Sequence, residues 1–148
     1  MGRIRVTKEF RFEMAHALYG YDGPCKNIHG HSYMLSITVI GETINKPQHP
    51  KNGMVLDFSE LKKVVQGEII AKLDHALVLN ADSPHKDFAH DSKLFEKIVL
   101  VNYQPTCENL LLDFVERIEP NLPAHITLHH LCLRETATSY AEWYAEDN

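Results

Sequence analysis

A seven-residue stretch, CKNIHGH, carries one thiol and two imidazoles, in Cys25, His29 and His31. Side chains two residues apart point to the same side of an extended strand, so the two histidines can bind one metal ion. Cys25 can either close a structural site as a further ligand or stand off the metal as a base or nucleophile. The spacing leaves both alternatives open, together with the alternative that a close histidine pair is an accident of the surface.

A third histidine enters through the strand that precedes this stretch. From Ile4 onward the sequence alternates between apolar and polar residues, which is typical of a half-buried strand. Continuing the count places His16 on the face of Phe12 and Met14, toward the core and near the end of the strand. Zinc is favoured by neutral imidazoles, and catalytic zinc keeps three protein ligands and one open position. The pattern therefore predicts a zinc site made by His16, His29 and His31.

Two further places carry polar groups that can act in chemistry. Asp74 and His75 are adjacent, and adjacent side chains face each other only where the backbone is irregular. Glu135 ends an apolar strand, where its carboxylate can accept two N–H donors from a heterocycle. The alternatives are a solvated acid beside a capping histidine, and a strand end that is polar because it meets water.

The elements that must position these groups follow from periodicity and turn residues. Asp57 and Thr106 are typical helix N-caps, and each precedes apolar residues at helical spacing. We expect helices over residues 57–71 and 105–119, strands over residues 4–16, 29–44, 125–135 and 139–144, and a further short strand as an option within 94–101. The order ββααββ predicts an α+β fold, in which two helices cover one face of a four-stranded antiparallel sheet.

Length and composition limit the function further. The 148 residues are most simply one domain, 1–148, with a formal net charge of −5 and no long basic run, which argues against nucleic acid as a partner and favours a small molecule. Three cysteines do not form a disulfide framework, so we expect free thiols and a cytoplasmic location. No run of about 18 apolar residues and no secretory signal is present, so no membrane association is expected.

Taken together, six ordered stretches resemble the superfamily of 6-pyruvoyl-tetrahydropterin synthase and 6-carboxy-tetrahydropterin synthase, which has the tunnelling fold. The stretches are FEMAHAL, CKNIHGHSY, GMVLDFSELK, LDHALVLN, PTCENL and LRET. The three residues between Cys25 and His29 are the short form of this spacing. The chain therefore looks more like the 6-carboxy-tetrahydropterin synthase of the queuosine (7-deazaguanine) pathway.

The resemblance implies a zinc-dependent lyase that converts 7,8-dihydroneopterin triphosphate to 6-carboxy-tetrahydropterin, with release of acetaldehyde and triphosphate. It implies the following roles: His16, His29 and His31 as zinc ligands, Cys25 as the catalytic thiol, Asp74 and His75 as its proton-handling partners, and Glu135 as the anchor of the pterin ring, assisted by Thr106 and Glu108. It also implies a homohexamer of two stacked trimers, whose sheets close into a barrel.

Two alternatives remain at this stage. A 6-pyruvoyl-tetrahydropterin synthase or a broader dihydropterin aldolase belongs to the same superfamily, and a zinc-binding module without turnover belongs to another class. The segment 81–103 is longer than a compact member of the superfamily needs, and the loop 45–52 is also extended. Neither touches the matched motifs, but the long insertion near Asp74 and His75 can alter access to the site or the substrate accepted.

Overall fold

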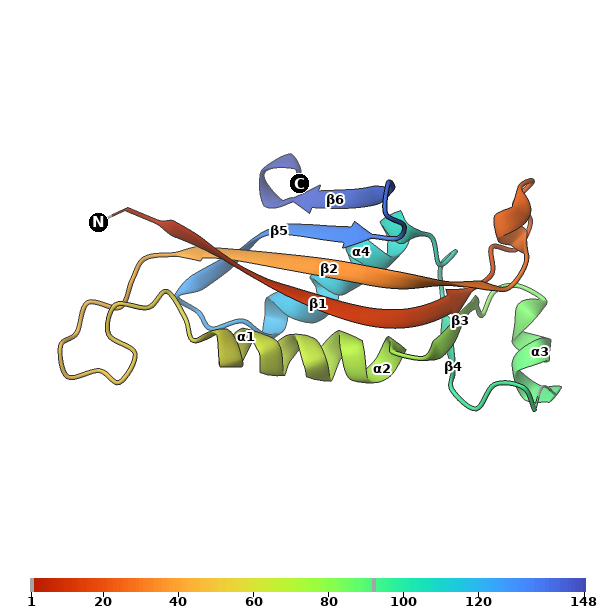
Figure 1. Cartoon of the computed structure of the whole chain (residues 1–148), viewed down its shortest axis with the longest axis horizontal. Helices are drawn as coiled ribbons and strands as arrows, with labels where there is room; N and C mark the ends of the chain where they lie inside the picture. The colour runs from red at the N-terminus through yellow and green to blue at the C-terminus, as the bar shows by residue number, and fades with distance from the viewer. Residues whose placement is uncertain (1, 92) are drawn as a thin grey trace.

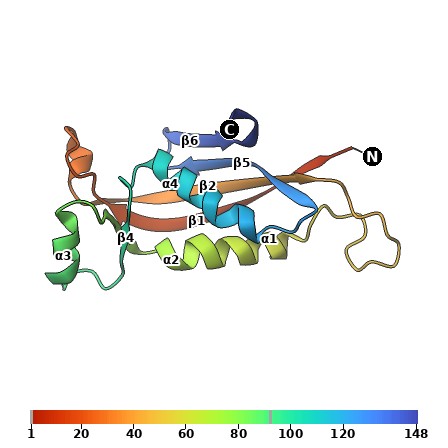
Figure 2. The same cartoon turned by 180° about the vertical axis from the view of Figure 1, so that it is seen from behind.

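The computed structural model describes residues 2–91 and 93–148, which form an elongated, curved sheet with its main helices on one face (Figures 1 and 2). The sheet has six strands in the order β4-β3-β1-β2-β5-β6. The strands are β1 (Ile4–His16), β2 (His29–Gly41), β3 (Ala76–Asn80), β4 (Ile98–Val101), β5 (Ile126–Arg134) and β6 (Tyr140–Tyr144). The helices are α1 (Phe58–Val65), α2 (Ala71–Leu73), α3 (His85–Asp91) and α4 (Cys107–Ile118), and the shorter or irregular turns are η1 (Pro24–Lys26), η2 (Gln66–Ile70), η3 (Glu119–Asn121) and η4 (Ala145–Asp147).

The long hairpin of β1 and β2 is the centre of the molecule. The two strands pair antiparallel from Ile4 opposite Gly41 to His16 opposite His29. Phe12 lies opposite Tyr33 on the inner face, where their rings stack with centroids 5.1 Å apart. The alternation in the sequence predicts this hairpin, and the structure confirms it.

The predicted count of four strands and the ββααββ order are wrong. The four predicted strands are present and antiparallel, but β3 and β4 extend the sheet beyond β1 and run parallel to it. The residues Ala76–Leu79 are apolar without alternation and are all buried, because β3 lies between β1 and β4 and both of its faces are covered. A period-two search misses such a strand. The long segment 81–103 contains α3 and β4, and β4 lies within the optional short strand predicted over residues 94–101.

The helices begin where the caps predict. The Asp57 carboxylate accepts a hydrogen bond from the backbone N–H of Ser59 at 2.8 Å, and the Thr106 hydroxyl accepts one from Asn109 N–H at 3.2 Å. The first helix continues through a π-helical turn, η2, into α2, so it reaches Leu73. None of the helices in the described residues combines the length and the apolar composition needed to cross a membrane.

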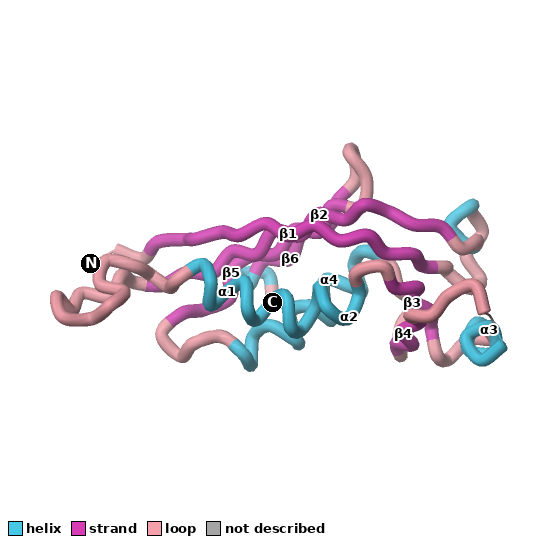
Figure 3. The backbone as a smooth tube through the Cα atoms, turned by 60° about the horizontal axis from the view of Figure 1, so that its bottom comes forward, coloured by secondary structure: helices cyan, strands magenta, loops and turns pink. Residues whose placement is uncertain are grey.

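The main helices lie along one face of the sheet (Figure 3), and the buried core residues come from these helices and the strands. Phe114 of α4 and Leu61 of α1 are fully buried, and the Phe114 ring meets the edge of Phe12 at 6.3 Å. Each such side chain contributes roughly 1.5–3 kcal/mol by leaving water. The same inner face of the sheet continues toward His16. The buried ring of Tyr33, a core residue, contacts the rings of His16 and His31, so the core supports the histidines from one side.

Candidate active site

The three predicted metal ligands lie together at one end of the hairpin. His16, His29 and His31 each place one ligand atom within 4.8 Å of the other two. His16 and His29 face each other directly across the strands, with their Nε2 atoms 3.0 Å apart. The ring of His31 is edge-on to the rings of both, with centroid distances of 5.3 and 4.9 Å.

Backbone carbonyls hold the outer nitrogens of two of these rings. Nδ1 of His16 lies 2.7 Å from the carbonyl oxygen of Pro105, and Nδ1 of His29 lies 2.7 Å from that of Asn27. A carbonyl oxygen only accepts, so both Nδ1 atoms carry the proton and both Nε2 atoms present a lone pair when the ring is neutral. Two lone pairs 3.0 Å apart repel each other. A cation between them removes this repulsion, so the residues present fit a metal ion such as zinc.

Burial favours the neutral, metal-binding form of two of the rings, those of His16 and His31. It lowers the pKa of His16 to about 4, and the ring is almost completely buried. Burial also lowers the pKa of His31, because desolvation outweighs the nearby Glu135 carboxylate. Nε2 of His31 lies 3.1 Å from Glu135 Oε1, but the two atoms do not have hydrogen-bond geometry. Because the lowered pKa leaves the His31 ring neutral at neutral pH, this contact is not an ion pair. That nitrogen is thus available as a ligand.

The buried His16 predicts an acid-sensitive metal-free protein. An unfolded chain binds a proton at His16 below pH 6.5, whereas the folded chain does so only below about 4. Stability from this group is complete above pH 6.5 and is lost as the pH falls to 4, by about 3 kcal/mol in total. Chemical unfolding of the metal-free protein across this range measures it. In His16→Asn, whose amide can still donate to Pro105, this part of the pH dependence should disappear; an unchanged slope would contradict the assignment.

A cavity of about 320 Å³ lies beside the histidines. Five of the predicted residues line it: His16, Cys25, Thr106, Glu108 and Glu135. They come from four separate parts of the chain, so the fold gathers residues that are far apart in the sequence. The cavity thus brings together a thiol, carboxylates and one histidine of the cluster. These groups are suited to proton transfer on a bound molecule.

Local structure fixes each group in this cavity. Cys25 lies in the 3₁₀ turn η1, which is tied to the end of β1 by a hydrogen bond from Leu18 N–H to the Cys25 carbonyl at 3.1 Å. Cys25 is a partly exposed free thiol. Thr106 and Glu108 lie at the N-terminus of α4, and Glu135 directly follows β5, where its N–H donates to the Ser139 carbonyl at 3.0 Å.

The Asp74–His75 pair lies apart from this cavity. His75 adopts the left-handed conformation, with φ of 60°, and this irregular backbone lets its Nδ1 approach Asp74 Oδ1 at 3.1 Å. A hydrogen bond from Glu13 N–H, at 2.9 Å, lowers the pKa of Asp74 and holds the carboxylate. The His75 side chain is 76% exposed and lines a different cavity, of about 310 Å³, which includes His31 but not Cys25. Within one chain, the pair is therefore not brought to the thiol.

Comparison with known proteins places this geometry in a family. The family model described as 6-pyruvoyl tetrahydropterin synthase matches residues 5–146. The chain belongs to this family.

Known members of this tetrahydropterin synthase family align with the chain over nearly its whole length. The chain is 32% identical over 142 residues to 6-carboxy-5,6,7,8-tetrahydropterin synthase of Haemophilus influenzae, covering 95% of this chain and 98% of that protein. It is 32% identical over 133 residues to dihydroneopterin monophosphate aldolase of Pyrococcus furiosus, covering 90% of each. The structure of Caenorhabditis elegans 6-pyruvoyl tetrahydropterin synthase matches with a TM-score of 0.68 at 23% identity, covering 98% of this chain and 97% of that one, which confirms the α+β fold of the family.

In this member of the tetrahydropterin synthase family, the site also includes residues that the sequence did not predict. Tyr21, from the loop between β1 and η1, and Ser139 and Tyr140, from the start of β6 and the turn before it, also line the cavity. The hydroxyl of Tyr33 is buried and has no hydrogen-bond partner within the described part of the chain. Its position two residues after His31, on the same face of β2, is the signal that could have found it. Cys107 also borders the cavity, but burial raises the pKa of its thiol to about 12, in keeping with a small apolar residue.

Proposed function

We propose that this protein is a zinc-dependent lyase that converts 7,8-dihydroneopterin triphosphate to 6-carboxy-tetrahydropterin, releasing acetaldehyde and triphosphate, in the cytoplasmic synthesis of queuosine and other 7-deazaguanines. The observation that carries the proposal is the histidine cluster, with its outer nitrogens held by carbonyls, beside a cavity lined by Cys25 and Glu135. The similarity to the Haemophilus synthase supports the carboxy product, and three free cysteines support a reducing compartment.

His16, His29 and His31 would hold the zinc through Nε2. Bound there, zinc supplies Lewis acidity to hydroxyl oxygens of the substrate side chain. Cys25, as thiolate, removes a proton from the carbon skeleton of the substrate within the cavity. The carbonyls of Pro105 and Asn27 keep two of the ligand rings in place during this step.

Glu135 would bind the ring of the pterin. Its carboxylate borders the cavity and has only the weak contact with His31, so it is free to accept N–H groups of a heterocycle. Thr106 and Glu108 border the same cavity from the N-terminus of α4 and would assist.

Replacing Glu135 with Gln should weaken substrate binding by about 1.5–3 kcal/mol, the usual contribution of a hydrogen bond to a charged group. The amide keeps the shape of the side chain but loses the charge and one acceptor. Binding of an unreactive pterin to the zinc-loaded protein measures the effect. Glu142→Gln, on the neighbouring strand, is a matched control that should bind the pterin normally. Unchanged affinity in Glu135→Gln would remove this residue from the pterin pocket.

The distance between Asp74–His75 and Cys25 motivates a proposal about assembly. We propose a homohexamer, two stacked trimers whose sheets close into a barrel, in which each Asp74–His75 pair serves the Cys25 cavity of a neighbouring subunit. The exposure of His75 supports this, as do the outermost strands β4 and β6, which are available for pairing with another copy.

Mixed oligomers test this assembly. Cys25→Ala and His75→Ala should each have strongly reduced turnover alone, whereas unfolding and refolding them together should raise turnover well above that of either variant. Activity returns because some sites then combine an intact thiol with an intact histidine from another chain. If every site were built within one chain, the turnover of the mixture would stay at the level of the variants, and sedimentation would still report the oligomer.

Product analysis after incubation with dihydroneopterin triphosphate tests the reaction itself. Acetaldehyde together with the carboxy product supports the proposal, whereas a pyruvoyl product without acetaldehyde would identify a 6-pyruvoyl-tetrahydropterin synthase instead. Dihydroneopterin monophosphate is the second substrate to assay, since the Pyrococcus relative is named for its cleavage. A zinc module without turnover predicts sulfur ligation by Cys25, which a thiolate band in the cobalt-substituted protein would reveal.

A further inference from the structure

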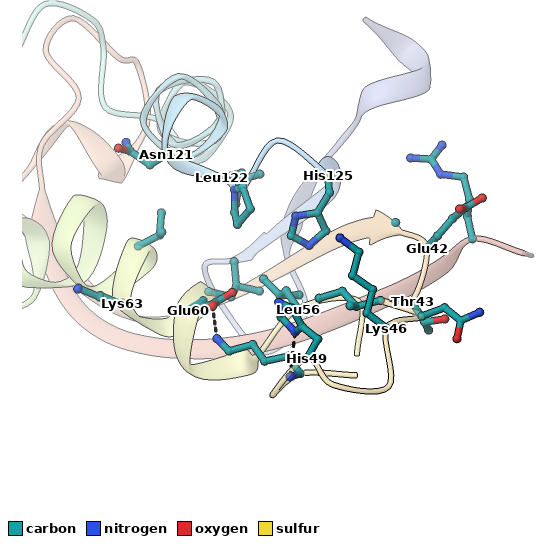
Figure 4. Close-up of a pocket in the computed structure, with 18 residues that line it drawn as sticks. Glu42, Thr43, Lys46, His49, Leu56, Glu60, Lys63, Asn121, Leu122 and His125 are labelled. Atoms are coloured by element: carbon teal, nitrogen blue, oxygen red, sulfur yellow. Dashed lines mark hydrogen bonds and ion pairs between the residues drawn. The ribbon is translucent and has the colours of Figure 1, made fainter. Parts of the chain in front are cut away.

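A further cavity lies at the other end of the hairpin from the histidines. It has a volume of about 910 Å³, against about 320 Å³ for the cavity beside Cys25. Figure 4 shows its walls: Lys46 and His49 come from the loop after β2, Glu60 and Lys63 from α1, and Leu122 and His125 from the segment before β5. None of the residues assigned to the reaction lines it.

One wall of this cavity is apolar. Leu56 and Leu61 are buried core residues that border the cavity, and Val64 and Leu122 are partly exposed beside them. The ring of His125 adds a flat surface and is held in place, because its Nε2 donates to the Val55 carbonyl at 3.0 Å. Such a wall can take the body of a drug-sized molecule, for which cavities of about 300–1,000 Å³ are usual.

The charge around this cavity is positive, although the whole chain carries −5. Four cationic side chains line it (Arg3, Lys46, Lys51 and Lys63), against two carboxylates (Glu42 and Glu60). The Lys51 ammonium bonds to Glu60 and lies 3.7 Å from Asp57, so this acid is already compensated. Within residues 2–91 and 93–148, no carboxylate lies within ion-pair distance of Lys46 or Lys63.

The loop that carries Lys46 is preformed. The N–H of Ile44 donates to Met54, and that of Gly53 donates back to Ile44, both at 2.8 Å. The N–H of Lys46 itself donates to the side-chain oxygen of Asn52 at 2.9 Å. The loop therefore needs little ordering when a ligand binds, which lowers the entropic cost of binding. Lys46 extends from it toward His125, whereas Lys63 lies on the far side of the cavity (Figure 4).

We propose that this cavity binds a small organic phosphate, with the phosphate beside Lys46 and an apolar or aromatic body against Leu122 and the ring of His125. A lysine ammonium without an acid partner is a usual point-charge ligand for phosphate. An organic phosphate should bind more tightly than the inorganic ion, because only the organic molecule has an apolar body that packs against the apolar wall. This second site is independent of the reaction at the histidines.

Equilibrium dialysis of the full-length, zinc-loaded protein against phenyl phosphate and against inorganic phosphate tests the proposal. We expect millimolar or tighter binding of phenyl phosphate and weaker binding of inorganic phosphate. Lys46→Gln should weaken phenyl phosphate about tenfold, the equivalent of one charge-assisted hydrogen bond. Lys86→Gln, an exposed lysine at the other end of the molecule, is the matched control and should bind normally.

A second variant separates the roles of charge and apolar surface. Leu122→Ser should weaken phenyl phosphate several-fold and leave inorganic phosphate unchanged, because it removes only the apolar contact. Circular dichroism confirms that each variant is folded. No binding by the wild type, equal binding by Lys46→Gln, or equal affinity for the two phosphates would overturn the proposal. Because dialysis does not depend on turnover, the result is distinct from any failure of the lyase assignment.

Discussion

Replacing Cys25 with alanine should reduce turnover by about 10²–10⁴-fold, the range that a positioned general base contributes, while zinc content stays at the wild-type level. The thiol borders the cavity beside His16, but the ligand atoms that converge belong to the three histidines. Steady-state kinetics with dihydroneopterin triphosphate and metal analysis of the same sample measure the two effects together.

Cys132→Ala is the matched control for this experiment. Cys132 is a free, partly buried thiol on β5 that does not line the cavity. Its variant should keep most of the turnover and all of the zinc. Normal turnover in Cys25→Ala would show that the thiol is not the base, and loss of zinc from it would favour the closed four-ligand site.

His29→Ala should lower zinc affinity by more than about 100-fold and abolish turnover. Loss of a residue that merely orients a metal ligand costs about 10–100-fold in affinity, so loss of a ligand should exceed this range. The alanine also leaves the buried Nε2 of His16 without its close neighbour. Competition with a chelator of known affinity measures the change.

His90→Ala serves as the control, because His90 is an exposed histidine on α3. Zinc affinity should be unchanged in this variant. If His29→Ala retained zinc at wild-type affinity while His90→Ala did too, the histidine cluster would not be the zinc site.

Much of the fold could be predicted, because several segments carry a local signal, either strand alternation or a helix cap, that is enough to assign them. Alternation predicts β1 and β2, and the caps at Asp57 and Thr106 predict where two helices begin. The same register argument places His16 on the inner face, next to His29 and His31. These groups depend only on strand geometry, so the sequence was sufficient to identify the histidine cluster.

The remaining features depend on long-range packing. β3 is covered on both faces and shows no alternation, so its pairing with β1 has no periodic signal. The π-helical turn η2 forms where Arg117 of α4 donates to the Glu68 carbonyl at 3.2 Å, a contact 49 residues apart. The approach of His75 to Asp74 involves a left-handed backbone at His75, which is uncommon for residues other than glycine and which the local sequence does not signal. No short stretch of sequence contains these causes.

The thirteen-residue register of β1 has a consequence for how the protein matures. His16 and His29 meet only because every pair before them, from Ile4 and Gly41 onward, is in place. A slip of one residue would turn the side chains of β1 to the opposite face of the sheet and separate the imidazoles. Binding of the proposed zinc would therefore act as a check on the hairpin register: chains with misaligned strands could not retain the ion, and the metal would selectively stabilise those that are correctly folded.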